Sequence, residues 1–438
     1  MTHFAPHRWI LGPMQEGKAI GRFGFLTYFG HGVYDSMLVL FLLEQGWSKA
    51  EIALLIPISA LTGIVIGPAW SMLADAVNKH KLILTISMIG TATCILVQSF
   101  SPPHALFWTA TVLMYIFAAS VSPITTGLTA SYSARTGGNY GKLKSYGPIG
   151  YGIGALLIGV VSQFTGLIII CYTFALILIG CVFVLRWFPT EAKRDDPVWT
   201  KLTVHTLFNR KTIGFWITVL LVTGPLQSFL SIFGLLYTSA GGNAADIGYA
   251  TMFGYFIEWI TLRYRQQLFK KFNQNMITCS VVLVLGVSWF AIYLFQSTVT
   301  FWFAFAGHGV GIALLISTFD LQMSKIGGEK LTSSSIGVLY SMISVAMFAC
   351  TALSSFAIKL TGDDYITALL FGIITIGGLF AMVRMYVKTK TNTSEKSPTL
   401  EPELPMQTKR TVNKPALLVG AVVMVGLLVI VKTKNTLR

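Results

Sequence analysis

Four ionisable residues lie inside long apolar stretches of the sequence, where charge is expensive. Asp35 and His31 lie in the first such stretch, and Glu258 and His308 lie in two stretches of the second half. A lone carboxylate at the centre of a bilayer costs about 2.5–3.5 kcal/mol on insertion scales, so each carboxyl group needs a partner or a water-filled cavity. These residues therefore indicate a site that handles protons or a polar solute.

A carboxyl group in such a position can load and release a proton, because an apolar environment favours the neutral acid and a nearby cation favours the carboxylate. We interpret Glu258 as the main proton-coupling residue and Asp35 as the second. For each, the alternative is a neutral carboxyl group bonded to a backbone carbonyl for packing. His308 could relay protons or bond a substrate hydroxyl, since imidazole both donates and accepts. The alternative for His308 is a satisfied core histidine, and we expect His31 to be structural.

Two further charged residues, Asp320 and Lys359, fall near the ends of apolar stretches. We expect both to reach the membrane surface by extending their side chains along the helix.

Aromatic residues with polar tips occur near the same depth as the ionisable residues. They are Tyr28, Tyr34, Tyr151, Tyr255 and Trp259. Such rings can stack on a sugar or a planar solute, and ordinary packing is the alternative for any one of them. Together with Asp35, Glu258 and Gln227 they predict a mixed polar and aromatic pocket.

The composition indicates the class of protein in which this pocket lies. Of the 438 residues, 54% are hydrophobic and 11% charged, and the mean hydropathy is +0.68. A soluble surface needs roughly a quarter of charged residues. This excludes water-soluble enzymes, disordered scaffolds and nucleic-acid binders. The net charge of +15 does not indicate a nucleic-acid partner, because the basic residues fall in short clusters between apolar runs. We predict an integral membrane protein that has the lipid bilayer as its partner.

Twelve apolar runs are long enough to cross a bilayer as helices, which need about 20 residues. They are 21–44, 50–73, 81–101, 103–128, 146–165, 166–187, 213–238, 245–263, 273–295, 298–320, 333–358 and 363–386. Basic residues follow the even-numbered runs and are scarce elsewhere. They therefore place both ends of the twelve-helix unit in the cytoplasm, and we expect a multi-pass protein of the plasma membrane.

The predicted fold is all-α, with two six-helix bundles at 1–187 and 213–388 joined by a cytoplasmic linker at 188–212. The tail at 389–414 is expected to be disordered. The apolar run at 415–431 predicts an additional helix, for which spanning is favoured over an interfacial anchor.

An internal repeat supports two halves of common origin. The segment from Gly46 to Ile52 (GWSKAEI) follows the first run, and that from Gly241 to Ile247 (GGNAADI) follows the seventh, 195 residues later. Both supply a Gly turn, a capping residue and an acidic residue, which start a helix favourably. Chance similarity of turn chemistry is the alternative. Parallel repeats facing each other across a central cavity are an established transporter plan.

Several other features indicate packing and not chemistry. The five cysteines lie in apolar runs without metal-ligand or disulfide spacing, so we expect buried thiols, no metal site and no organic cofactor. No removable signal peptide is apparent in the first twenty residues. The spacing of Gly150 and Gly154 predicts close helix packing.

Residues 20–388 resemble the major facilitator superfamily, and within it the lactose-permease-like and phenylpropionate-permease-like proton symporters. The segment from Ser71 to Lys81 (SMLADAVNKHK) is similar to the superfamily's loop after the second helix, G-x-L-A-D-R-x-G-R-K, and departs at Ser71, Ala76 and Asn78. The resemblance implies a gating role for Asp75, Lys79 and Lys81.

The segment from 140 to 151 (YGKLKSYGPIGY) is similar to the family's entry to the fifth helix. The resemblance implies that Lys144 and Tyr151 in this segment bind the substrate. It implies the same role for Glu258 in the eighth helix and His308 in the tenth. Tyr34, Gln227 and Trp259 complete our candidate substrate-binding set.

The chain departs from lactose permease at Thr126 and Gly311, which fall where that transporter has acidic residues, and its seventh helix has no aspartate. Lactose is therefore not implied, and we expect the proton route to use Asp35 instead.

These features predict a secondary active transporter that moves a small polar organic solute, a sugar or an organic acid, by proton symport and alternating access. We expect a monomer that is not an enzyme. The main alternative is a proton-coupled multidrug efflux antiporter, for which the glycines and proline at 147–152 give a faint similarity. A polytopic membrane enzyme, and a receptor or structural role, are more distant alternatives.

Overall fold

The computed structural model describes residues 13–47, 55–100, 103–188, 212–241, 244–327 and 331–393, and within these ranges the chain is helical with no strand. The predicted all-α fold is confirmed. The predicted helix at 415–431 lies outside the described residues, as does most of the predicted linker. The predicted disordered tail also lies outside them, except that its first residues, to Thr393, continue the last helix.

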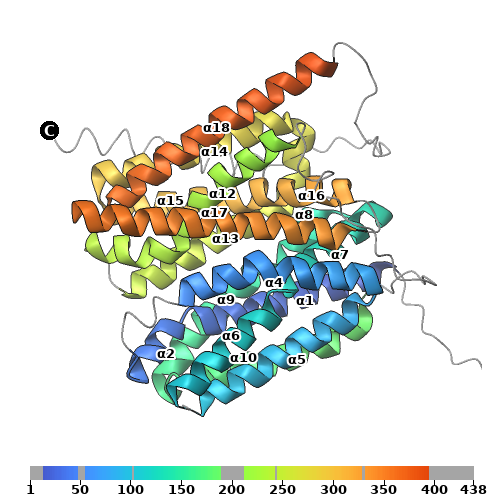
Figure 1. Cartoon of the computed structure of the whole chain (residues 1–438), viewed down its shortest axis with the longest axis vertical. Coiled ribbons are helices and arrows are strands. Elements are labelled where there is room, and N and C mark those ends of the chain that lie inside the picture. Colours follow the sequence, from blue (N-terminus) through green and yellow to red (C-terminus); the bar gives the residue numbers. More distant parts are fainter. Residues whose placement is uncertain are drawn as a thin grey trace, which may run out of the picture.

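The first half of the chain forms one bundle and the second half another, and Figure 1 shows them one above the other. The N-bundle contains α1 (Pro13–Asp35), α2 (Leu38–Glu44), α4 (Leu55–Val77), α5 (His80–Ser99), α6 (His104–Ala118), α7 (Val121–Thr136), α8 (Tyr140–Lys144), α9 (Tyr146–Thr165), α10 (Ile169–Val184) and η1 (Leu185–Trp187). The C-bundle contains α12 (Ile213–Ser239), α13 (Ala244–Lys271), α14 (Gln274–Phe295), α15 (Thr298–Gly311), η2 (Ile312–Ile316), α16 (Ser317–Gly327), α17 (Thr332–Thr361) and α18 (Ile366–Thr393).

Each of the twelve predicted spans is present as a helix or as two helices in series. Among the described residues, eleven segments are long and apolar enough to cross a membrane. The remaining predicted span, the eighth, corresponds to α13, which is less apolar because it carries Glu258, Arg263 and Arg265. The tenth span contains a π-helical segment, η2, between α15 and α16.

Local sequence explains where several helices begin and end. The side chains of Asn139, Asn273 and Ser297 accept hydrogen bonds from backbone N–H groups in the first turns of α8, α14 and α15. The repeat is also visible in the backbone, because Gly46 and Gly241 have nearly the same left-handed φ, +82° and +83°. Glycine adopts this conformation without steric cost.

Buried apolar side chains form two cores, one within each bundle. The first contains Phe23 and Phe174, and the second contains Phe229 and Trp289, each at most 2% exposed. The close packing predicted from Gly150 and Gly154 is confirmed, because a Cβ at either position would overlap a backbone carbonyl of α1.

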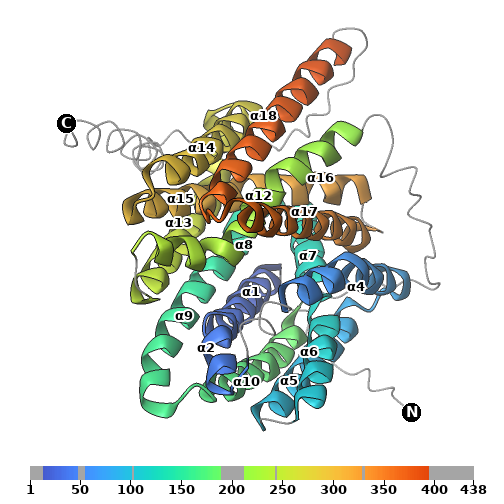
Figure 2. The same ribbon diagram turned by 60° about the vertical axis from the view of Figure 1, so that its left-hand side comes forward.

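Hydrogen bonds that join the bundles lie toward one end of the molecule, which we call the gate end. There Asp75 bonds Ser334, and Lys144 pairs with Asp320. In both views α4 lies beside α17 (Figures 1 and 2). The basic residues of the sequence predict that the gate end faces the cytoplasm. The bundles are therefore closed against each other at this end.

Candidate functional site

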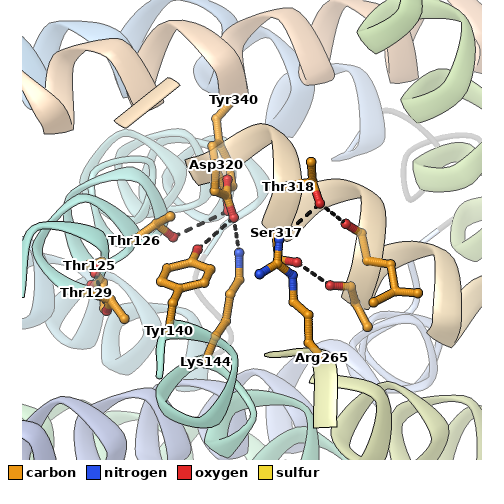
Figure 3. Close-up of polar contacts among 12 residues, drawn as sticks. Thr125, Thr126, Thr129, Tyr140, Lys144, Arg265, Ser317, Thr318, Asp320 and Tyr340 are labelled. Atoms are coloured by element: carbon orange, nitrogen blue, oxygen red, sulfur yellow. Dashed lines mark hydrogen bonds and ion pairs between the residues drawn. The ribbon is translucent and has the colours of Figure 1, made fainter. Parts of the chain in front are cut away.

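A polar cluster at the gate end joins the two bundles around one ion pair. Lys144, at the end of α8, pairs with Asp320 on α16, and the hydroxyl of Tyr140 donates to Asp320 at 2.9 Å (Figure 3). The side chain of Asp320 is fully buried and that of Lys144 is 16% exposed. Tyr340 of α17 lies beside the pair, and its hydroxyl is 3.4 Å from that of Thr126. We call these five residues the Lys144 cluster.

A cavity in the N-bundle adjoins this cluster. It has about 50 Å³ of free volume and is lined by α1, α7, α8 and the start of α9. Hydroxyl groups dominate its polar wall, together with the ammonium of Lys144. The residues that carry these hydroxyls are Thr27, Tyr28, Ser122, Thr125, Thr126, Thr129 and Tyr140. The Thr125 hydroxyl is buried without a hydrogen-bond partner among the described residues. Buried polar groups are normally paired, so this hydroxyl is available to a bound solute or water.

Glu258 lies midway along α13 and is 6% exposed. Its carboxyl group has no hydrogen bond to another described residue, and Lys144 is near enough to interact with it electrostatically. One turn before Glu258, Tyr255 stacks on Tyr151 of the N-bundle with ring centroids 4.3 Å apart, and one turn after it the Leu262 carbonyl contacts Gly141. The structure thus brings Glu258, Tyr151 and Lys144 to the interface between the bundles.

Asp35 lies inside the first span, as expected, at the break between α1 and α2, and it is away from the gate end. Its side chain is 47% exposed and pairs with His31 at 3.1 Å. An exposed carboxylate needs no proton to be stable. Its assignment as a proton-coupling residue stays a prediction, and it does not belong to the Lys144 cluster.

Asp75 joins the bundles at the gate end, as a gating residue would. It is 3% exposed, and one oxygen accepts from the backbone N–H and the hydroxyl of Ser334, at 2.6 and 2.7 Å. Ser334 lies in the first turn of α17, where a carboxylate satisfies unpaired N–H groups and interacts favourably with the helix dipole. The other oxygen of Asp75 is 2.7 Å from Nε2 of His80.

The two lysines predicted to share the gating role have different positions. Lys79 is exposed at the N-cap of α5, and Lys81 donates to the backbone oxygen of Phe188 at 2.7 Å, within the N-bundle.

Three residues of the predicted substrate site lie away from the cluster. Tyr34 is 2% exposed in the core of the N-bundle, where its hydroxyl donates to Gln98 at 2.7 Å. Trp259 lies against Phe256 and lines a separate groove on the side of the molecule. Gln227 is partly buried on α12 and does not line the cavity beside Lys144. The structure does not bring these three residues together with Lys144, and their substrate-binding roles stay predictions.

His308 lies in the core of the C-bundle. It is 4% exposed, its Nε2 donates to the Leu226 carbonyl at 2.9 Å, and its ring packs beside Phe229 and Phe305. This environment favours the structural alternative, and its proton-relay and substrate-binding roles stay predictions.

Sequence reasoning missed the most important partner in the site. Asp320 was expected to reach the membrane surface, but it is fully buried and ion-paired. The available signal was its acidic side chain beside an apolar run, but its distance from Lys144, 176 residues along the chain, hid the pairing. Sequence reasoning also gave no role to His80, the partner of Asp75 in the segment from Ser71 to Lys81. Among the described residues, no group of three or more His, Cys, Asp or Glu side chains could hold a metal.

Comparison with known proteins identifies the family. The family model of the Major Facilitator Superfamily matches residues 23–351. The chain belongs to this superfamily. It is similar to the maltose permease of Geobacillus stearothermophilus, with 23% identity over 383 residues that cover 85% of this chain and 95% of the permease. It is also similar to the probable 3-phenylpropionic acid transporter of Escherichia coli, with 22% identity over 59% of this chain and 70% of that transporter.

Solved structures of superfamily transporters share the fold. The human organic anion transporter MFSD10 matches with a TM-score of 0.67 and 12% identity, covering 85% of this chain and all of that one. The E. coli fucose:proton symporter matches with a TM-score of 0.63 and 10% identity, covering 86% of this chain and 99% of that one. This superfamily member is thus a multi-pass membrane transporter with the expected fold.

Proposed function

We propose that this transporter carries a small, neutral, hydroxyl-rich solute such as a sugar across the plasma membrane together with protons. The hydroxyl-lined cavity beside Lys144 is the observation that carries the proposal. With about 50 Å³ of free volume, the cavity in this closed form is smaller than the range of about 300–1,000 Å³ typical of small-molecule sites, so the solute would enter it when the gate end opens. A hydroxyl wall can both donate to and accept from the hydroxyls of a sugar.

The charge of the cavity supports a neutral solute. Lys144 is the basic residue of its wall and is already neutralised by Asp320, so an organic anion would have to displace a buried carboxylate. Sugars are named for two of the similar proteins, the maltose permease and the fucose:proton symporter.

Proton coupling is assigned to Glu258. A buried carboxylate without hydrogen-bond partners is costly, so Glu258 favours the neutral form while the gate end is closed. Opening of the gate end would admit water and allow the proton to leave. The membrane potential, which is negative on the cytoplasmic side, favours inward transfer of the proton by about 2.3 kcal/mol per charge per 100 mV.

The test is uptake into proteoliposomes under an inward proton gradient, with radiolabelled maltose, fucose and 3-phenylpropionate as candidate solutes. We expect a sugar to be accumulated and to drive proton uptake. Glu258→Gln should abolish accumulation while leaving sugar exchange, and Glu44→Gln, at an exposed glutamate, should behave as the wild type. Proton-driven export, or transport of the carboxylate alone, would overturn the proposal.

A further inference from the structure

A second cavity, separate from the transport site, opens on the side of the molecule. This side groove has a volume of about 750 Å³ and is lined by α1, α9 and α10 of the N-bundle and by α13 of the C-bundle. α1 packs against both α9 and α10 (Figure 2). Arg22, Tyr146, Trp259 and Arg263 supply its polar groups, and the rest of the lining is apolar.

The two arginines of the side groove lack protein partners. Arg22 is exposed and Arg263 is partly buried, and neither has an ion pair or a hydrogen bond within the described part of the chain. Two guanidinium groups that line one groove create a site for a polyanionic or phosphate-type ligand, because guanidinium matches phosphate oxygens in geometry and charge.

The level of the groove in the membrane identifies the source of the anion. Of the spans predicted from the sequence, the first begins near Arg22 and the eighth ends at Arg263, so we expect both arginines at the membrane surface on the gate end. Tyr146 and Trp259 have the amphipathic rings that favour this headgroup region. A free anion would leave the apolar lining uncovered, whereas a phospholipid would place its acyl chains there.

We propose that the side groove binds an anionic phospholipid of the leaflet at the gate end, with its phosphate held between Arg22 and Arg263. Because these residues belong to different bundles, the lipid bridges them. Bound lipid therefore stabilises the form in which the gate end is closed. This inference does not depend on the identity of the transported solute.

The test is binding of phosphatidylglycerol to the purified, delipidated full-length transporter in detergent, followed by native mass spectrometry and by the melting temperature. Phosphatidylcholine and inorganic phosphate are the comparison ligands. Each basic residue near a membrane surface contributes a factor of about five, so the double variant Arg22→Gln/Arg263→Gln should bind phosphatidylglycerol about 30-fold more weakly.

The matched control removes two arginines outside the groove, Arg186→Gln/Arg384→Gln, and should bind as the wild type. The variant Arg22→Lys/Arg263→Lys, which keeps the charge, should bind at least fivefold more tightly than the glutamine double variant. Equal binding of phosphatidylcholine, full competition by inorganic phosphate, or unchanged affinity of the glutamine double variant would each overturn the proposal.

Discussion

Removing the charge of Asp320 should open the gate end. In the closed form Asp320→Asn leaves Lys144 with a buried, unpaired charge, while the amide still fills the space and still accepts from Tyr140. Breaking a buried ion pair by losing one partner costs about 3–5 kcal/mol. The side chain of Lys144 retains 16% exposure, so we take the lower value of about 3 kcal/mol.

This cost falls mainly on the closed form, because opening the gate end exposes Lys144 to water. The ratio of open to closed molecules should therefore rise about 140-fold in Asp320→Asn, as every 1.4 kcal/mol is tenfold. Removing both charges in Lys144→Gln/Asp320→Asn should return the ratio toward that of the wild type, because no charge is then left unpaired.

Distances between spin labels can measure this ratio. Thr136 of α7 and Lys325 of α16 are exposed at the gate end on opposite bundles, and the five free cysteines would first be replaced. Glu16→Gln serves as the control, since it breaks the more exposed pair with Arg135, which is worth about 0–1 kcal/mol. The reasoning would be refuted by unchanged distances in Asp320→Asn, or by a double variant that is as open as the single variant.

Three further substitutions test individual contacts. Gly141→Ala should also favour the open gate end, because the added Cβ would overlap the Leu262 carbonyl of the other bundle. The control is Gly180→Ala, where an added Cβ has no atom within 4 Å. Equal spin-label distances in the two variants would contradict the packing argument. Gly24→Leu extends a side chain into the cavity beside Lys144 and should raise the KM for the solute at least tenfold. The control variant Gly180→Leu should leave the KM unchanged. An unchanged KM in Gly24→Leu would place the solute elsewhere. His308→Phe should lower the free energy of unfolding by about 1–3 kcal/mol, because the Leu226 carbonyl loses its hydrogen-bond donor. The variant should keep the pH profile of transport. Loss of coupled proton uptake would instead support a proton relay through His308.

The sequence predicted the helices well because twenty apolar residues in a row have few other structures available in a membrane. It also singled out Glu258, Lys144 and Tyr151, which lie at the interface, and Asp75, which lies at the gate end, through features that are local in the chain; their roles stay predictions. Helix existence and local motifs do not require knowledge of what lies opposite.

What the sequence could not supply is the rotation of each helix and the pairing across the interface. Tyr34 and Asp35 are neighbours, yet one lies in the N-bundle core and the other is exposed. Likewise, Glu258 faces the interface, whereas its neighbour Trp259 faces the side groove. The partner of Lys144 comes from the other bundle, and only the packing of α8 against α13 and of α7 against α16 and α17 reveals it.

The π-helical segment η2 lies between His308 and Asp320 on the same span. A π segment holds one residue more than regular α-helix of the same length. Because the wider turn accommodates this residue, deleting one residue from Ile312–Ile316 should restore regular α-helix and leave Asp320 facing Lys144. The tenth span can therefore change its length by one residue between His308 and Asp320, whereas the same deletion from a regular helix would turn Asp320 by about 100°.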